Sequence, residues 1–251
     1  MYATCEWGLA GASALADAAD LFIVVDVLSF STCVDVACAN GASVFPFAHG
    51  DRDAARAEAK RLGAKLAGRR SDPDSVYTLS PPSLKAIPPQ ERLVLPSPNG
   101  SRISFALTGK PVLAGCLRNA RAVAHAASEL AGGGTIAVIP AGEHWPDGSL
   151  RPAIEDLLGA GAILAELDAE LSPEAMVARA AFLGAASQLD PVISGSVSGR
   201  GLSDMGFAGD VECALDLNAS DCVPVLCDGA YRTRMSSAAQ PDQHAPRRRS
   251  A

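Results

Sequence analysis

Aromatic residues and long apolar runs are both scarce in this sequence of 251 residues. Phe, Trp and Tyr make up 5% of the chain, which disfavours a surface that stacks on exposed nucleic-acid bases. No stretch reaches the roughly 18 uninterrupted apolar residues of a membrane span. The N-terminus carries Glu6 and lacks a basic region before an apolar run. We therefore expect a cytoplasmic protein with no membrane segment.

Paired cysteines are also missing. The cysteines are odd in number and none belongs to a Cys-x-x-Cys pair; they are Cys5, Cys33, Cys38, Cys116, Cys213, Cys222 and Cys227. This pattern disfavours a zinc ribbon and a disulfide framework. Free cysteines usually behave as small buried apolar residues, so we expect these to lie in the core of a protein from a reducing compartment.

Several common motifs of phosphate chemistry are absent. Gly109-Lys110 is followed by Pro111, which excludes a Walker A loop. No cysteine has an arginine six positions later, as a Cys-phosphate intermediate of the tyrosine-phosphatase type would need, and Leu28 stands where haloacid-dehalogenase phosphatases have a second aspartate after Asp26. The four histidines show no metal-binding spacing. A bound metal would therefore be held by carboxylates and water, which favours Mg²⁺.

Positive charge is in short supply over most of the chain. The formal net charge is −7, although five arginines and only one acidic residue occur from Arg232 onward. The preceding residues hold 16 basic and 27 acidic side chains, a net charge of −11. An acidic body disfavours a nucleic-acid partner. If this body binds a phosphorylated or carboxylated small molecule, clustered arginines or a divalent cation must offset the repulsion.

What is present is the pattern of an α/β protein. Apolar residues make up 48% and charged residues 20% of the chain, a balance that allows a buried core. Short apolar runs rich in β-branched residues predict strands at 21–28, 43–47, 92–95, 111–114, 135–139 and 223–226. Segments between them predict helices at 33–39, 51–62, 103–107, 120–130, 152–167, 173–189 and 209–217. This alternation favours a mostly parallel or mixed sheet with helices on both faces.

Two segments lack such patterns. Residues 68–90 contain five prolines and form a long irregular connection, a kind of loop that is often functional. Residues 232–251 include the Arg247-Arg248-Arg249 run and little apolar sequence, so we expect a disordered tail. Because no repeat or clear linker interrupts residues 1–231, we expect them to form one domain.

A series of short motifs extends over most of the chain. They are Glu6-Trp7-Gly8, VVDVLSFST at 24–32, LAGRR at 66–70, SPNGSR at 97–102, RNARAVA at 118–124, PAG at 140–142, IEDLLGAGAI at 154–163, SGRGLSDMGFAGDVE at 198–212 and LNASDCVPVL at 217–226. In their order and spacing they resemble the 2-phosphosulfolactate phosphatase family of coenzyme M biosynthesis. The resemblance implies a three-layer α/β/α architecture with a mixed sheet. It also implies Mg²⁺-dependent hydrolysis of a phosphomonoester on a small sulfonated acid.

Polar residues of these motifs stand near the ends of predicted strands, where α/β folds collect ligands. With the resemblance, Asp26 and either Glu155 or Asp156 become the candidate catalytic carboxylates that hold Mg²⁺. The candidate substrate-binding residues are Ser31, Thr32, Arg70, Asn99, Gly100, Ser101, Arg102 and Asn119. Asp210 and Glu212 fit either the same acidic centre or the start of a helix. The expected partner is a small anionic phosphorylated acid, and homo-oligomer formation is left open.

Each candidate also has a structural interpretation. Asp26 in an apolar run could cap the following turn, although a buried carboxylate needs a partner or a metal. Ser31 and Thr32 could be helix N-caps, which is compatible with phosphate contact because helix N-termini attract anions. Asn99-Gly100 is a turn signal in any protein. The neighbours Glu155-Asp156 point roughly 100° apart on a helix, so at most one is expected to reach a site directly.

The chain departs from the family pattern at three places. Ser29 stands where family members usually carry an arginine, Arg69-Arg70 replaces a Glu-Arg pair, and Thr78-Leu79-Ser80-Pro81 replaces Gly-Asn-Ser-Pro. By the resemblance, each place is one where an anionic substrate or its metal would be bound. The departures support an alternative function, that of a catalytically silent homologue that binds an anionic metabolite.

Overall fold

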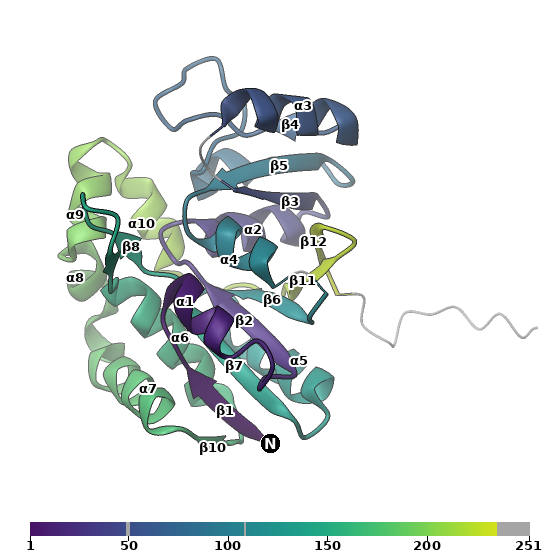
Figure 1. Ribbon diagram of the computed structural model, residues 1–251. Coiled ribbons are helices and arrows are strands. Elements are labelled where there is room, and N and C mark those ends of the chain that lie inside the picture. The colour runs from purple at the N-terminus through teal and green to yellow at the C-terminus, as the bar shows by residue number, and fades with distance from the viewer. Residues whose placement is uncertain (49–50, 108, 235–251) are drawn as a thin grey trace, which may run out of the picture.

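The computed structural model describes residues 1–48, 51–107 and 109–234, and in this part of the chain ten strands form one mixed sheet (Figure 1). The strand order is β10-β1-β7-β2-β6-β11-β12-β3-β5-β4. One parallel block consists of β10 (Glu170–Leu171), β1 (Tyr2–Cys5), β7 (Thr135–Pro140), β2 (Leu21–Val25) and β6 (Val112–Gly115). A second parallel block consists of β3 (Ser43–Ala48), β5 (Arg92–Ser97) and β4 (Lys65–Leu66).

A C-terminal hairpin joins the two parallel blocks. It consists of β11 (Pro224–Cys227) and β12 (Ala230–Thr233), which pair with each other antiparallel. Through Val225, β11 also pairs antiparallel with β6, and through Tyr231, β12 pairs antiparallel with β3. The two blocks therefore run in opposite directions, with the hairpin between them.

Helices cover both faces of the sheet in the described part of the chain. They are α1 (Gly8–Ala14), α2 (Phe30–Ala39), α3 (Arg52–Leu62), α4 (Gly100–Ala106), α5 (Ala120–Ala131), α6 (Ile154–Glu166), α7 (Pro173–Ala185), α8 (Leu189–Ser194), α9 (Val197–Asp204) and α10 (Ala208–Ala214). The other elements are two 3₁₀ turns, η1 (Pro81–Leu84) and η2 (Ala186–Gln188), and a small separate hairpin of β8 (Glu143–His144) and β9 (Leu150–Arg151).

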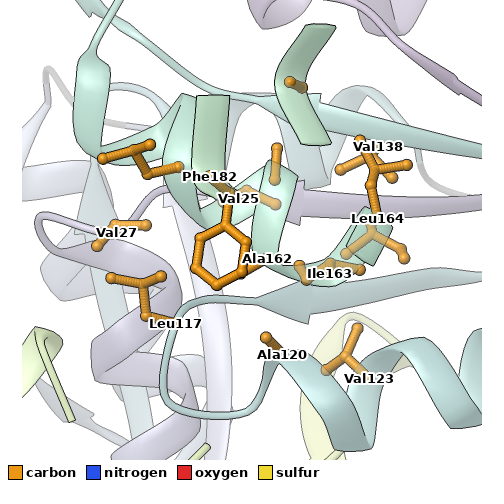
Figure 2. Close-up of a cluster of buried hydrophobic side chains, with 14 of the residues drawn as sticks. Val25, Val27, Leu117, Ala120, Val123, Val138, Ala162, Ile163, Leu164 and Phe182 are labelled. Atoms are coloured by element: carbon orange, nitrogen blue, oxygen red, sulfur yellow. The ribbon is translucent and has the colours of Figure 1, made fainter. Parts of the chain in front are cut away.

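The alternation of side chains along β2 builds two core layers. All of β2 is buried, as expected of a central strand with helices on both sides. Leu21, Ile23 and Val25 pack with residues of α5, α6 and α7, and Figure 2 shows this layer around Val25. Phe22 and Val24 pack on the opposite face with residues of α1, α2 and α4. The expected three-layer α/β/α fold is confirmed.

The helix α3 covers the second block and shows how local signals set the ends of an element. Its Ala59 is buried in a small apolar cluster with Val94 of β5. Asp51 caps the first turn by accepting two backbone N–H groups, and Gly63 ends the helix in the left-handed conformation with φ of 60°. The helix expected at 51–62 is therefore confirmed.

The other predicted strands and helices are also present, with shifted ends. The strand expected at 21–28 ends at Val25, so that Asp26 begins the loop that leads to α2. Ser31 and Thr32 lie inside the first turn of α2, whose N-cap position is Ser29, so neither is an N-cap residue. Sequence analysis did not predict the short strands β1, β4, β8, β9, β10 and β12 or the helices α1, α8 and α9. Such two- to eight-residue elements have little sequence signal of their own and depend on tertiary packing.

The expected disordered tail at 232–251 is wrong at its first residues. Arg232 and Thr233 belong to β12. The backbone N–H of Arg234 donates to the carbonyl oxygen of Val223, and its guanidinium donates to Glu129 at 2.7 Å. These residues are held in place because β12 fills the position between β11 and β3. Residues 235–251 lie outside the described part of the chain, and the single domain expected over 1–231 stays a prediction.

None of the described helices has the length and apolar composition that crossing a membrane would require.

Candidate active site

A cavity of about 370 Å³ lies where the loops that follow β2 and β5 meet. Its polar lining residues are Asp26, Ser29, Asp51, Arg52, Arg69, Arg70, Ser71, Ser97, Asn99 and Glu143. The rest of the lining is Leu28, Phe47, Ala48, Ala55, Ala67, Gly68, Leu79, Pro96, Pro98, Met205 and Phe207. The lining includes Arg52 and Ala55 of α3, which lies at the top of Figure 1, and Met205 and Phe207 from between α9 and α10, which lie at the left. The cavity thus collects residues from both parallel blocks.

Asp26 lies where two helix N-termini converge. Its Oδ1 accepts the backbone N–H of Phe30 at 3.1 Å, and its Oδ2 accepts the backbone N–H of Gly100 at 2.9 Å. The Ser97 hydroxyl also points to Oδ2, at 3.5 Å. A carboxylate with only 6% of the residue exposed is costly unless its oxygens accept hydrogen bonds. The starts of α2 and α4 meet this need and hold the carboxylate at the cavity wall.

Burial raises the pKa of Asp26 to about 6, and the nearby Glu143 carboxylate adds to the rise. The amide groups of Phe30 and Gly100 and the positive charge of Arg70 act in the opposite direction. The carboxyl is therefore ionised at neutral pH, at a free-energy cost that a cation in the cavity would relieve.

Glu143 and Asn99 form the next part of the same wall. The Asn99 amide nitrogen donates to Oε2 of Glu143 at 3.0 Å. The Asn99 amide oxygen is buried and has no hydrogen-bond partner among the described residues. Sequence analysis missed Glu143, although it directly follows the Pro140-Ala141-Gly142 motif at the end of β7. That position at a strand end is the signal that could have identified it.

Arg70 supplies the fixed positive charge of the cavity. Its Nε donates to Oδ2 of Asp210 at 2.8 Å, and its Nη2 donates to the Ser29 hydroxyl at 2.9 Å. Asp210 is buried in the first turn of α10, and its other oxygen accepts the hydroxyl of Ser80. Of the two acids that the sequence left undecided, Asp210 positions Arg70, whereas Glu212 is exposed. The guanidinium is thereby held in one orientation beside Asp26.

A family model described as 2-phosphosulpholactate phosphatase matches residues 11–229. The chain belongs to this family. It is 35% identical over 211 residues to a 2-phosphosulfolactate phosphatase of Methanothermobacter thermautotrophicus, covering 83% of this chain and 88% of the relative. It is also 30% identical over 210 residues to a probable 2-phosphosulfolactate phosphatase of Carboxydothermus hydrogenoformans, covering 80% and 84%. These matches confirm the resemblance that the motifs indicate.

The three departures from the family pattern all lie in the cavity lining or among the residues that support it. Ser29 and Arg69 line the cavity. In the segment 78–81, Leu79 lines the cavity and the Ser80 hydroxyl donates to Asp210. In this family member the Ser29 hydroxyl accepts a hydrogen bond from Arg70, so a small polar group supports the guanidinium at that position.

Asp156 lies behind Asp26 and not in the cavity lining. Its Oδ1 accepts the backbone N–H of Val27 at 2.7 Å, and its Oδ2 accepts that of Gly142 at 2.9 Å. Burial holds the pKa of this carboxyl well above its ordinary value, and the charges of Asp26 and Glu155 raise it further. Asp156 thus ties the loop after β2 to the loop after β7. A metal-binding role for Asp156 stays a prediction.

Glu155 is buried at the start of α6, and one of its carboxylate oxygens has no hydrogen-bond partner among the described residues. It does not line the cavity. The structure therefore places Asp156 near Asp26 but brings neither acid of α6 to the cavity surface, and the catalytic roles expected of them stay predictions.

Four predicted substrate-binding side chains are engaged with the backbone. The Ser31 hydroxyl donates to the carbonyl oxygen of Val24 and accepts the backbone N–H of Asp26. The Thr32 hydroxyl donates to the carbonyl oxygen of Val27, and the Ser101 hydroxyl donates to that of Leu95. The amide of Asn119 donates to the carbonyl oxygens of Ala114 and Cys222 and accepts the N–H of Cys116. All four are buried and none lines the cavity. Their contacts shape the loops of the site.

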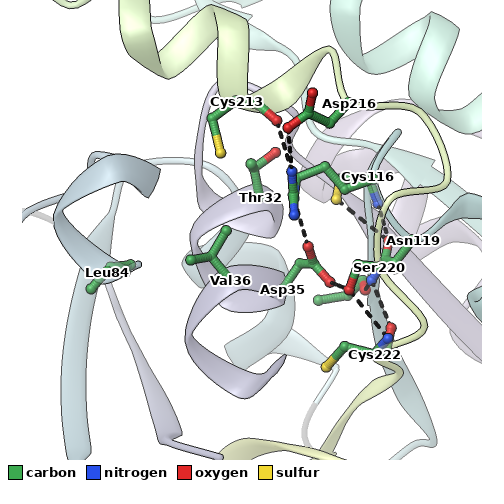
Figure 3. Close-up of polar contacts among 12 residues, drawn as sticks. Thr32, Asp35, Val36, Leu84, Cys116, Asn119, Cys213, Asp216, Ser220 and Cys222 are labelled. Atoms are coloured by element: carbon green, nitrogen blue, oxygen red, sulfur yellow. Dashed lines mark hydrogen bonds and ion pairs between the residues drawn. The ribbon is translucent and has the colours of Figure 1, made fainter. Parts of the chain in front are cut away.

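Figure 3 shows the polar network that includes Asp35, Asn119 and Asp216. Arg118 donates to Asp35 of α2 at 2.9 Å and to Asp216, also at 2.9 Å, just beyond α10. It also donates to the carbonyl oxygen of Cys213, near the end of α10. Because Asp210 at the start of α10 binds Arg70, this network fixes the helix that positions the Arg70 guanidinium at the cavity.

The remaining two candidates differ in their relation to the cavity. Gly100 contacts Asp26 through its backbone N–H, and an added Cβ at this position would lie 2.3 Å from the Phe30 ring. Arg102 is exposed and lines a separate, smaller cavity of about 100 Å³. Asn99 lines both cavities. The structure therefore brings together Asp26, Arg70 and Asn99 but leaves Arg102 outside the main cavity.

The donor set at the cavity wall fits Mg²⁺. Within the described residues, no three or more His, Cys, Asp or Glu side chains are arranged to hold a metal. A protein-bound Mg²⁺ commonly uses only one or two carboxylates and completes its shell with water and substrate phosphate. Asp26 and Glu143 supply two carboxylates, and the unpartnered amide oxygen of Asn99 is a third oxygen ligand of the type that Mg²⁺ prefers.

Proposed function

We propose that this chain is a Mg²⁺-dependent phosphohydrolase that acts on a small, strongly anionic phosphomonoester, with 2-phosphosulfolactate as the substrate. The observation that carries the proposal is that Asp26 and Arg70 line the same cavity of about 370 Å³. A volume at the low end of the range for ligand pockets suits a three-carbon phosphorylated acid. The names of the two relatives supply the substrate.

Arg70 would bind the phosphoryl group. Two of its N–H groups are engaged with Asp210 and Ser29, which leaves the remaining donors of the five-donor guanidinium for phosphate oxygens. The two contacts fix the guanidinium before substrate binds. A donor that is already oriented stabilises charge on the phosphoryl oxygens without reorganisation during the reaction.

Asp26 and Glu143, with the amide oxygen of Asn99, would hold Mg²⁺. When bound, the metal polarises the phosphoryl oxygens and lowers the pKa of an attacking water molecule. Asp26 contributes its negative charge in the ionised form, which prevails above about pH 6. The amide groups of Phe30 and Gly100 keep this carboxylate in place.

The apolar part of the lining complements these charges. Leu28, Phe47, Leu79, Pro96 and Phe207 border the cavity. Apolar walls exclude water and lower the effective dielectric constant, so charge–charge interactions with the phosphomonoester are stronger than at an open surface.

The experiment is phosphate release from 2-phosphosulfolactate by the purified protein. We expect turnover in the presence of Mg²⁺ and its loss in a chelator, with recovery when Mg²⁺ is restored. Equal release with and without the chelator would overturn the metal requirement. Stabilisation of the protein by the ligand without any phosphate release would overturn catalysis in favour of the silent binder.

A further inference from the structure

Among the described residues, three arginines and three acidic residues line the cavity, and the proposed function uses Arg70, Asp26 and Glu143 but neither of the other two arginines. The three arginines are Arg52, Arg69 and Arg70, all on the side formed by α3 and the segment after β4. Arg70 is held in place by its ion pair with the buried carboxylate of Asp210 at 2.8 Å. The other two arginines have no comparable partner among the described residues.

Arg52 is only weakly paired. Its Nη2 lies 3.9 Å from Oδ2 of Asp72, and the two side chains are 40% and 31% exposed. An ion pair of this length and exposure contributes little. Both adjacent acids are engaged elsewhere: Asp51, which also lines the cavity, uses Oδ1 to cap α3 through the N–H groups of Asp53 and Ala54, and the Asp53 carboxylate pairs with Arg56. Arg52 therefore lines the cavity without a close ion pair among the described residues.

Arg69 is exposed, lines the cavity, and has no ion pair or side-chain hydrogen bond with any described residue. It stands beside Arg70 in the chain, so two guanidinium groups follow one another where the segment after β4 meets the cavity. Arg52 lies at the first position of α3, where the helix dipole adds further positive potential. Arg52 and Arg69 thus bring two cations without close ion pairs to one small cavity, and an anion bound between them would offset their mutual repulsion.

We infer that Arg52 and Arg69 form a second anion site, which binds a carboxylate or sulfonate group of the substrate that is not transferred. The inference rests on the proposed function, since it assigns the phosphoryl group to the Asp26 and Arg70 side of the same cavity. The chain then selects phosphomonoesters that carry a second acid group. Monoesters without one leave both arginines without a partner.

This division of the cavity predicts which kinetic constant distinguishes monoesters with a second acid group from those without one. Contacts to a group that does not react are made equally in the ground state and the transition state. Their loss therefore raises KM and leaves kcat nearly unchanged. A charge-assisted hydrogen bond to an acid group is strong enough that loss of either arginine should raise KM roughly tenfold.

The test uses three monoesters on the same carbon skeleton. Isopropyl phosphate has no second acid group, 2-phospholactate has a carboxylate, and 2-phosphosulfolactate has a carboxylate and a sulfonate. We expect Arg52→Gln and Arg69→Gln each to raise KM for the two acids roughly tenfold, and to leave KM for isopropyl phosphate unchanged. Arg56→Gln is the matched control, because Arg56 is a 62% exposed arginine of α3 that pairs with Asp53 and does not line the cavity. Equal effects on all three esters, or none, would overturn the second anion site.

A binding measurement separates this inference from the proposed function. Sulfolactate, the dephosphorylated acid, is titrated calorimetrically into the wild-type protein and the same variants. We expect binding that weakens in Arg52→Gln and Arg69→Gln but not in Arg56→Gln. If no ester is hydrolysed and sulfolactate still binds in this manner, the proposed function fails and the anion site stands. If sulfolactate binds equally to all four proteins, or to none, the anion site is overturned whatever the turnover.

Discussion

Replacement of Asp26 by asparagine separates a catalytic role of this carboxylate from a structural one. The substitution keeps the shape of the side chain and removes its charge. One of the two oxygens becomes an NH₂ group, which cannot accept the hydrogen bond now made by Phe30 or by Gly100. One buried backbone N–H thus loses its partner, which costs about 1–3 kcal/mol.

The loss of charge acts in the opposite direction. The pKa of Asp26 rises from 3.8 to about 6 on folding, which corresponds to roughly 3 kcal/mol by which folding disfavours the ionised form at neutral pH. The uncharged amide of the Asp26→Asn variant does not carry this penalty. Because the two effects nearly cancel, we expect the melting temperature of the metal-free protein to change by only a few degrees.

Turnover should respond far more strongly than stability. If Asp26 holds Mg²⁺, its replacement by asparagine should reduce Mg²⁺-dependent phosphate release roughly a hundredfold or more, on the scale of other lost electrostatic contacts. Calorimetry and phosphate release on the same preparation give both quantities. Ser172→Ala is the control, because Ser172 is a buried residue that caps α7 by accepting the N–H of Ala175 and does not line the cavity. That variant should lose stability and keep the turnover of its folded fraction. A destabilised but fully active Asp26→Asn protein would remove Asp26 from the active site.

Three further predictions follow from the contacts of the site. Arg70→Lys should raise KM for the phosphomonoester at least roughly tenfold, because an ammonium group lacks the planar fork that binds Asp210 and phosphate together; steady-state kinetics with unchanged KM would contradict this role. Gly100→Ala should destabilise the protein by on the order of 2 kcal/mol, since the added methyl group overlaps the Phe30 ring, and urea unfolding with an unchanged midpoint would show that the ring moves away freely. The free energy of unfolding of the metal-free wild type, relative to that of Asp26→Asn, should increase as the pH is lowered from about 6 toward 3.8, because the folded state binds the proton of Asp26 more tightly than the unfolded state. Urea unfolding of both proteins at several pH values measures this difference, and a difference that does not vary with pH would contradict the raised pKa.

Structural features that depend only on residues close together along the chain can be predicted from the sequence. The apolar run that begins at Leu21 predicts a buried strand, and Asp51 and Gly63 mark the ends of α3. Asp26 can be identified as a candidate site residue for a similar reason, since a carboxylate at the end of such a run must be hydrogen-bonded, paired or metal-bound. Periodicity, capping and desolvation act within a few residues, so their consequences can be derived from the chain alone.

The assignment of polar residues to the active site needs the tertiary structure. Asn119 and Ser101 were expected to bind substrate and instead bind backbone groups. Glu143 was not expected at all and lines the cavity beside Asn99. A buried polar group needs a partner, but the sequence does not say whether that partner is the backbone, another side chain or a ligand. Asp210 shows the same limit, because Arg70, which it positions, lies 140 residues away in the chain.

The sequence by itself determined the α/β class, the family, and Asp26, Asn99 and Arg70 as residues of interest. It also predicted six of the twelve strands and seven of the ten α-helices in the described part of the chain. Tertiary structure decided the strand order, with the hairpin β11–β12 between two parallel blocks, and it decided which loops meet at the cavity. The physical reason is the range of the interactions. Strand and helix formation respond to patterns a few residues long, whereas strand pairing and the shape of a site depend on contacts between segments that only the folded chain brings together.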